Sequence, residues 1–313
     1  MKKEIEISIV VPVYNSSSSL EELNRCISDA LALSLSYELI LVNDGSTDNS
    51  WEKIKLLSRS NRAITGISLR KNSGQDNALL AGLRTAKGNY CVIMDDDLQH
   101  DPSDIIRLYN ECRKGYDVCY AKFGAKKQSA IKNIGSEANG KVAEVLVKKP
   151  QGIYMSPFKI MNRLTVEEIC KFAGAYPYID GIILTITQNL SQVDCIHRKR
   201  HSGKSTYTFS RSFSVFMKHF TGFSVLPLRV ATIGGIIATL IGILLGVKYC
   251  YDYFVVKDFV PGWTTVVILI IFFGGLILIT LGIIGEYIGR MYLTLNNKPQ
   301  YSISEVVRSR EDE

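Results

Sequence analysis

The chain has 313 residues, 46% of them apolar, and a formal net charge of +7 at pH 7. This length accommodates one large domain or two smaller ones. The seven cysteines are scattered and include no C-x-x-C pair, which excludes a disulfide or zinc framework and fits a reducing compartment. The N-terminal residues MKKEIEIS lack an apolar stretch, so no secretory signal peptide is expected.

The first part of the chain alternates between β-branched apolar runs and segments with helical spacing. Runs of this kind that alternate with helices are typical of a mostly parallel sheet between helical layers, an α/β fold. In such folds ligands bind beyond the carboxyl ends of the strands. Strands are predicted over Ile5–Tyr14, Tyr37–Val42, Ile64–Leu69 and Tyr90–Met94, and helices over Leu20–Leu35, Thr47–Leu57, Gly74–Thr85 and Ser103–Arg113.

Three consecutive aspartates, Asp95, Asp96 and Asp97, follow the fourth predicted strand. Adjacent carboxylates repel one another and stay ionised at little cost only beside a cation or in water. On an extended backbone Asp95 and Asp97 point to one side and Asp96 to the other. Oxygen ligands favour Mg²⁺ or Mn²⁺, so the segment is either a metal site, with Gln99 as a further ligand, or a solvated acidic turn. His100 is expected to face solvent.

The last third of the chain contains two long apolar runs. Val230–Val247 has no charged residue, and Phe259–Gly285 is interrupted only by a Pro-Gly pair near its start. A bilayer requires about 20 apolar residues of helix, so both are predicted to be transmembrane helices, over about 229–250 and 263–285. The alternative is a pair of core helices in a soluble protein, but such helices usually keep a polar stripe.

Charge and aromatic residues near these runs give the expected orientation and domain limits. Basic residues lie ahead of the first run and after the second, so both flanks are expected in the cytosol. Phe209–Leu226 mixes aromatic and basic residues and is either an interfacial helix or an ordinary amphipathic core helix. The expected divisions are a cytosolic α/β domain over 1–205, interfacial helices over 206–228, a transmembrane hairpin over 229–290 and a cytosolic tail over 291–313.

Four motifs occur in a fixed order: VVPVYN (Val10–Asn15), VNDGSTD (Val42–Asp48), NSGQDNALLAG (Asn72–Gly82) and MDDDLQHDP (Met94–Pro102). Their order and their places at strand and helix ends resemble family 2 glycosyltransferases, which have the Rossmann-like GT-A fold. With the two apolar runs and GEYIGRMY (Gly285–Tyr292), nearly the whole chain is similar to polyprenyl-phosphate glycosyltransferases. These include dolichyl-phosphate mannose synthase and the undecaprenyl-phosphate glucosyl- and aminoarabinose transferases.

The resemblance implies a site at the ends of the strands. Asp95 and Asp97 would be the catalytic residues and would hold Mg²⁺ or Mn²⁺ with Gln99. Asn43 stands where the family often has the first aspartate of Asp-Asp-Gly-Ser. Little loss of nucleotide binding is expected, because the second aspartate, here Asp44, is the one usually in contact. Asn72, Gly74 and Gln75 either line the pocket or cap the following helix. The implied nucleotide-binding residues are Pro12, Tyr14, Asn15, Asp44, Ser46, Gln75 and Asp95.

Two basic segments are candidates for the phosphate of a lipid acceptor. Arg200 and Ser205 match the R-x-x-G-x-S pattern that family members carry ahead of the first span, and guanidinium suits phosphate oxygens. Lys132 and Ser136 have the spacing of a second phosphate-binding pair, with Lys where Arg is usual. The alternatives are a basic loop attracted to anionic lipid and an exposed face of an amphipathic helix.

Some relatives carry an aspartate, proposed as a catalytic base, where this chain has Pro157, and the nearest other carboxylate is Asp180. A phosphate monoester has a second pKa of about 6, so the acceptor is already largely anionic at neutral pH. Such a nucleophile needs positioning and charge shielding more than a base.

The expected function is inverting transfer of a sugar from a nucleotide-sugar, a UDP-sugar by preference, to polyprenyl (undecaprenyl) phosphate. It would take place at the cytosolic face of the inner membrane and serve cell-envelope polysaccharide synthesis. Homotetramers are implied by resemblance, and no nucleic-acid partner is expected. One alternative is a processive polysaccharide synthase. Such enzymes carry a Q-x-x-R-W segment, which this chain lacks because neither Trp51 nor Trp263 follows an arginine. The other is an inactive membrane scaffold, against which the intact D-x-D argues.

Overall fold

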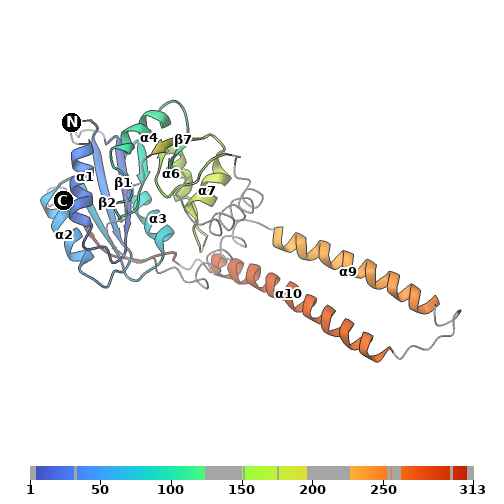
Figure 1. Ribbon diagram of the computed structural model, residues 1–313. Helices are drawn as coiled ribbons and strands as arrows, with labels where there is room; N and C mark the ends of the chain where they lie inside the picture. Colours follow the sequence, from blue (N-terminus) through green and yellow to red (C-terminus); the bar gives the residue numbers. More distant parts are fainter. Residues whose placement is uncertain are drawn as a thin grey trace. The chain divides into compact units, whose positions relative to one another are not determined.

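The computed structural model describes residues 5–31, 34–123, 150, 152–174, 176–195, 226–251, 255, 262–296 and 299–308. The chain forms two compact units (Figure 1). The first comprises residues 1–209 together with 298–313, and the second comprises residues 210–297.

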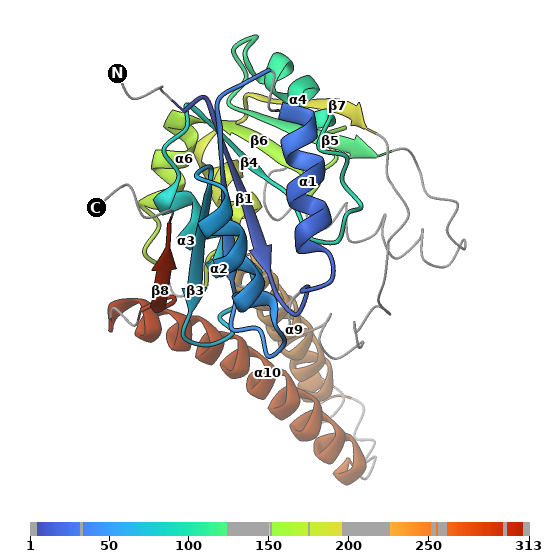
Figure 2. The ribbon, with the colours of Figure 1, turned by 90° about the vertical axis from the view of Figure 1, so that its left-hand side faces the viewer.

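The first unit is built on an eight-stranded sheet with the strand order β7-β5-β6-β4-β1-β2-β3-β8. The central strands β4, β1, β2 and β3 are parallel, whereas β6 and β8 run antiparallel to their neighbours β4 and β3. Helices α1 and α2 cover one face of the sheet and α3 and α6 the other (Figure 2). The elements in chain order are β1 (Ile7–Val13), α1 (Leu20–Leu31), β2 (Tyr37–Asn43), α2 (Ser50–Ser60), β3 (Ile64–Leu69), α3 (Gln75–Thr85), β4 (Tyr90–Ile93), α4 (Asp104–Cys112), β5 (Val118–Phe123), β6 (Lys159–Asn162), α6 (Arg163–Cys170), α7 (Ile179–Ile186), β7 (Leu190–Cys195), α9 (Leu226–Tyr251), α10 (Trp263–Leu295) and β8 (Ile303–Val307).

The core explains why the sequence pattern predicts these elements. The apolar side chains of β1 are buried on both faces of the sheet, as expected for a central parallel strand. In α1 the residues Leu20, Leu23, Ile27 and Leu31 recur at helical spacing, and all four are buried against the sheet. The predicted mostly parallel α/β fold is confirmed, and each of the predicted strands and helices up to Arg113 is present with ends shifted by a few residues.

The segment after α10 returns to the sheet, which the sequence pattern does not predict. Strand β8 pairs antiparallel with β3, with Ile67 opposite Val306. Trp51 Nε1 donates a hydrogen bond to Glu305 at 3.1 Å, and Arg84 donates to the side chain of Gln300 at 3.1 Å. The described part of the expected tail therefore belongs to the first unit, and the two helices α9 and α10 are an insertion between parts of one domain.

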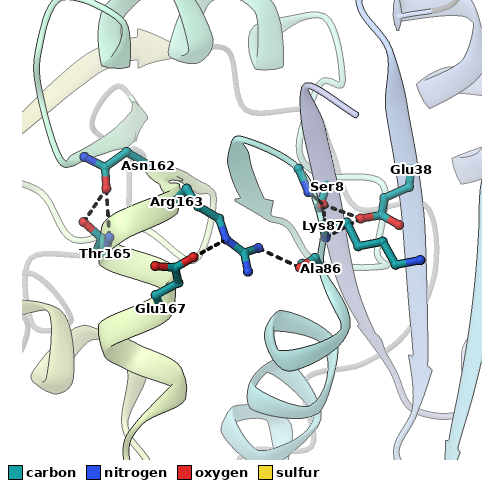
Figure 3. Close-up of polar contacts among 9 residues, drawn as sticks. Ser8, Glu38, Ala86, Lys87, Asn162, Arg163, Thr165 and Glu167 are labelled. Atoms are coloured by element: carbon teal, nitrogen blue, oxygen red, sulfur yellow. Dashed lines mark hydrogen bonds and ion pairs between the residues drawn. The ribbon is translucent and has the colours of Figure 1, made fainter. Parts of the chain in front are cut away.

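Polar contacts fix the end of the sheet where β1 and β4 begin, opposite the candidate site (Figure 3). Buried Ser8 donates to Glu38 at 2.5 Å, and Glu38 also accepts from the backbone N–H of Lys87 at 2.7 Å. Arg163, the first residue of α6, donates to the carbonyl of Ala86 at 2.7 Å. These contacts anchor the turn between α3 and β4, and so set where β4 begins.

The described part of the second unit is made up mainly of α9 and α10, which are apolar and largely exposed. Leu244 and Leu278 are each 71% exposed, and soluble monomers rarely show such contiguous apolar surface. By length and composition, Ala231–Lys248 and Phe272–Leu295 could each cross a membrane. Helix α10 extends beyond the predicted limit at 285, and most of the predicted interfacial segment lies outside the described residues.

Candidate active site

The carboxyl ends of the central strands bring the predicted motifs to one edge of the sheet. Val13 at the end of β1 is in register with Asn43 at the end of β2. Val10 in β1 is in register with Ile93 at the end of β4. The residues that follow these strands therefore lie along one rim, in the spatial order β2, β1, β4.

The loops that follow β1 and β2 are joined by hydrogen bonds. Asn15 has the left-handed backbone angle φ 53°, and its side-chain oxygen accepts from the backbone N–H of Thr47 at 2.8 Å. The Ser46 hydroxyl accepts from the backbone N–H of Asn15 at 3.0 Å, and Asp48 accepts from that of Ser17 at 3.1 Å. The side chains of Asn15 and Ser46, predicted to contact a nucleotide, hold the two loops together.

Asp44 lies at the floor of this part of the rim. It is 3% exposed, and its two carboxylate oxygens accept from the backbone N–H groups of Ser73 at 2.7 Å and Gly74 at 2.9 Å. Burial raises the pKa of Asp44, and these two hydrogen bonds oppose the rise. Nearby, Pro12 is partly buried and the Tyr14 ring is 49% exposed, which leaves an aromatic face available to a flat ligand.

Asn43 uses both ends of its amide. Nδ2 donates to Ser68 at 3.0 Å, and Oδ1 accepts from the backbone N–H of Ser46 at 3.2 Å. Gly45 follows with φ 64°, and a Cβ there would lie 2.5 Å from the backbone nitrogen of Asn72. The amide at position 43 therefore has a role in holding this turn.

Asp95 lies where β4 ends and carries a strongly shifted pKa. Its carboxylate accepts from Gln75 Nε2 at 2.9 Å. Burial, followed by the charges of Asp97 and Asp96, raises the pKa of Asp95 to about 7, against the opposing effects of the Lys159 ammonium and the Gln75 hydrogen bond. The repulsion from Asp97 is the larger of the two carboxylate effects, so Asp95 and Asp97 act on each other as a pair.

Asp96 faces different partners. Burial is the main cause that raises the pKa of Asp96 to about 6; hydrogen bonds from the Ser16 side chain and the Tyr14 backbone oppose the rise, and the Asp97 charge adds to it. Asp97 accepts from the backbone N–H of Gln99 at 3.1 Å. Asp96 therefore supports the loop after β1, whereas Asp95 is held by the N-terminal residue of α3.

His100 is buried, and the expectation that it faces solvent is wrong. It is 4% exposed, and its ring stacks on Phe123 and Phe158 with centroids 5.5 and 5.0 Å away. Its Nδ1 accepts from the backbone N–H of Asp95 at 3.3 Å. Leu98, between them, has φ 62°, a costly angle for a residue with a side chain. The imidazole thus fixes the tight turn that presents the aspartates.

The donor set suits a divalent cation that is shared with a ligand. Among the described residues, no group of three or more His, Cys, Asp or Glu side chains is placed to hold a metal. Mg²⁺, however, is usually held by one or two carboxylates and completes its coordination with phosphate oxygens and water. The mutual repulsion of Asp95 and Asp97 is what a cation between them would relieve. The carboxylates of Asp95 and Asp97 therefore have the donor chemistry that Mg²⁺ or Mn²⁺ prefers, and Gln99 stays a predicted further ligand.

A buried charged pair, Lys159 and Asp180, adjoins the aspartates and has no counterpart in the sequence motifs. Lys159 begins β6 in register with Ile93 of β4, which brings it beside the end of β4. Its ammonium pairs with Asp180 at the start of α7, and Tyr120 in β5 donates to the same carboxylate at 3.0 Å. Sequence spacing could not reveal this pair, because β6 enters the sheet between β4 and β5, far from its neighbours in the chain.

The predicted acceptor-phosphate residues cannot be placed in this site. Lys132 and Ser136, like Arg200 and Ser205, lie outside the residues that the structure describes. Their role stays a prediction. Gln75 contacts Asp95, and the backbone of Gly74 contacts Asp44, so both lie at the rim.

Comparisons with known proteins agree with this architecture. An uncharacterised glycosyltransferase of Synechocystis is 30% identical over 308 residues, covering 96% of each chain. An undecaprenyl-phosphate 4-deoxy-4-formamido-L-arabinose transferase of Photorhabdus laumondii is 29% identical, covering 96% of this chain and 94% of the relative.

Solved structures share the fold. The crystal structure of glucosyl-3-phosphoglycerate synthase from Mycobacterium tuberculosis, in complex with Mn²⁺ and UDP-glucose, matches with a TM-score of 0.51 and 18% identity. The match covers 69% of this chain and 77% of that one. The family description Glycosyl transferase family 2 matches residues 8–169. With the strand-end aspartates and the GT-A arrangement of the sheet, this shows that the chain belongs to glycosyltransferase family 2.

Proposed function

We propose that this glycosyltransferase moves a sugar, with inversion, from a nucleotide-sugar to a polyprenyl phosphate, undecaprenyl phosphate in particular. The observation that carries the proposal is the gathering of Tyr14, Asp44 and the aspartates of the D-x-D along one rim. The same chain holds two long, exposed apolar helices. A rim of this kind suits a nucleoside diphosphate, and the helices suit an acceptor that stays in a membrane.

The relatives support the choice of both substrates. The Photorhabdus relative is named for transfer to undecaprenyl phosphate, and the mycobacterial structure holds UDP-glucose with Mn²⁺. The donor proposed here is therefore a UDP-sugar. A homotetramer is proposed on family resemblance alone.

The charge of the leaving group is the main demand of this reaction. Asp95 and Asp97, with Gln99, would hold Mg²⁺ or Mn²⁺, which supplies positive charge to the departing nucleoside diphosphate. Gln75 and His100 keep Asp95 in place through a hydrogen bond to its carboxylate and one from its backbone N–H. Tyr14 offers a face for the base, and Asp44 would contact the nucleotide only through lone pairs that the Ser73 and Gly74 N–H groups leave unused.

The nucleophile is the acceptor's phosphate, which is largely anionic at neutral pH and needs no strong base. Asp180 is a poor candidate for a base, because Lys159 and Tyr120 bind its carboxylate. Lys132, Ser136, Arg200 and Ser205 are proposed to hold the phosphate, which polar and cationic side chains can position.

The membrane arrangement follows from the path of the chain. Because β8 completes the sheet of the first unit, both ends of the helical hairpin join the same domain. Two spans between them would leave that domain on one side of the membrane, and the basic flanks favour the cytosolic side of the inner membrane.

A transfer assay tests the proposal. Membranes that contain the protein are incubated with undecaprenyl phosphate, Mg²⁺ or Mn²⁺ and a panel of labelled nucleotide-sugars, and label is counted in the lipid fraction. We expect one sugar to enter the lipid, and Asp97→Asn to reduce the rate by about 100- to 1000-fold, the effect typical of losing one charge-stabilising group.

The same preparation separates an enzyme from an inactive scaffold. An enzyme should be stabilised against melting by UDP with Mn²⁺, and a scaffold should not. If no donor labels the lipid, or if Asp97→Asn matches the wild type, the proposed function is wrong.

A further inference from the structure

Among the described residues, hydrogen bonds reach only one of the two oxygens of the Asp180 carboxylate. Oδ1 accepts from both Lys159 Nζ and the Tyr120 hydroxyl. Oδ2 makes no hydrogen bond to any residue that the structure describes. The Asp180 side chain is 18% exposed, against 3% for Lys159, so Asp180 is the member of the pair that reaches the surface.

Three other elements hold Asp180 in this position. Lys159 in β6 is 2% exposed and Tyr120 in β5 is fully buried, with the ammonium 5.2 Å from the centre of the Tyr120 ring. Asp76 in the first turn of α3 accepts from the backbone N–H of Ile179 at 3.2 Å, which fixes the turn that carries Asp180. A buried ion pair contributes little net stability, but a side chain locked by such contacts is a precisely placed hydrogen-bond acceptor.

The pair occupies a defined place along the rim. The strand order runs from β2 through β1 to β4 and then β6. The loops that would hold the base follow β2 and β1, and the D-x-D that would hold the diphosphate follows β4. Lys159, next along at β6, exerts its charge on Asp95. A nucleotide-sugar laid along this rim therefore has its sugar beside Asp180.

We propose that Asp180 accepts a hydrogen bond from a hydroxyl of the donor sugar and so determines which sugar is transferred, with Lys159 and Tyr120 as its positioning residues. This inference rests on the proposed function, because it assumes that a nucleotide-sugar binds along the rim with its base near β2 and its sugar near β6. The second oxygen is held in place by the contacts of the first with Lys159 and Tyr120, and it can accept a hydrogen bond. It therefore selects a sugar that donates a hydrogen bond there and rejects a deoxy sugar or a uronate that places a carboxylate at the same point.

The test compares donors in the purified full-length enzyme. Wild type, Asp180→Asn and Tyr120→Phe are assayed with the best UDP-sugar of the panel and with its analogues that each lack one hydroxyl. We expect one analogue to be transferred about 10- to 100-fold less efficiently by the wild type, the range for one hydrogen bond to a charged group. Asp180→Asn should lose a similar factor with the full sugar and discriminate little against that analogue. Tyr120→Phe should also lower the transfer efficiency with the full sugar and the discrimination against that analogue, but by smaller factors than Asp180→Asn.

Binding of UDP with Mn²⁺, measured by calorimetry, is the control. It should stay within about twofold of wild type in both variants, because Asp180 is placed beyond the diphosphate. An equal loss of kcat with every donor, with discrimination unchanged, would overturn the proposal, because it would indicate a role in chemistry or folding and not in sugar contact.

The affinity for the intact UDP-sugar relative to UDP separates this inference from the proposed function. If no donor labels the lipid, the proposed acceptor is wrong, but the affinity ratio still reports the sugar contact. A ratio that is the same in wild type and Asp180→Asn contradicts the inference whatever the acceptor is. Should Asp180→Asn not fold, the ratio in Tyr120→Phe decides.

Discussion

The two halves of the rim are built from different materials. The half after β1 and β2 is held by hydrogen bonds in which no cationic side chain takes part: Asn15 contacts Ser46 and Thr47, and backbone N–H groups donate to the carboxylates of Asp44 and Asp48. The half at β4, β6 and α7 is held by buried charges, with Lys159 acting on Asp180, Asp76 and Asp95. Neutral hydrogen bonds are individually replaceable, whereas a buried charge that loses its partner is left with its full desolvation cost. The charged half should therefore be the more sensitive to substitution.

The largest effect is expected for Lys159→Met. It leaves the Asp180 carboxylate largely buried without its cation, so the free energy of unfolding should fall by about 3–5 kcal/mol. Denaturant unfolding of the detergent-solubilised protein measures this. Lys171→Met is the matched control, because the Lys171–Glu168 pair is exposed, at 68% and 50%, and should contribute at most about 1 kcal/mol. Equal losses in the two variants would remove the distinction between the two halves.

A smaller effect with a definite pH dependence is expected for Asp76→Asn. Burial, with a smaller effect of the Asp180 charge, raises the pKa of Asp76 from 3.8 to about 6, although the Ile179 N–H and the Lys159 ammonium oppose the rise. Because the folded pKa is the higher one, ionisation costs the folded state, and stability from this group is lost as pH rises from about 4 to about 6.

Asparagine keeps an oxygen for the Ile179 N–H and has no charge. Asp76→Asn should be more stable than wild type by on the order of 2–3 kcal/mol at pH 7.5, with the difference shrinking toward zero near pH 4. Unfolding of both proteins across this range is the measurement. Parallel stability curves would show that Asp76 is not strained by its burial.

The smallest effect is expected in the half after β1 and β2, for Asn15→Ala. Alanine loses the bonds to Thr47 and disfavours the backbone angle of 53°, for a total of about 1–2 kcal/mol. Asn15→Gly keeps the backbone angle accessible and loses only the hydrogen bonds, so it should cost less. Melting temperature and UDP affinity are the measurements. A cost for Asn15→Ala as large as that of Lys159→Met would contradict the comparison.

The central sheet and the positions of its motifs follow from local sequence patterns alone. β-branched runs and helical spacing are local properties, and a carboxyl end of a parallel strand places Tyr14, Asp44 and Asp95 on one edge without further information.

The neighbours of those strand-end residues depend on contacts between parts of the chain that are distant in sequence. His100 is buried because Phe123 and Phe158 come to it from β5 and the start of β6, and Asp180 is fixed because β6 enters the sheet between β4 and β5. Strand β8 pairs with β3, although both helices of the hairpin lie between these strands in the chain. In each case the partner is distant in the chain, and the pairing is set by burial of apolar surface and balance of charge in the assembled fold, which no local pattern encodes.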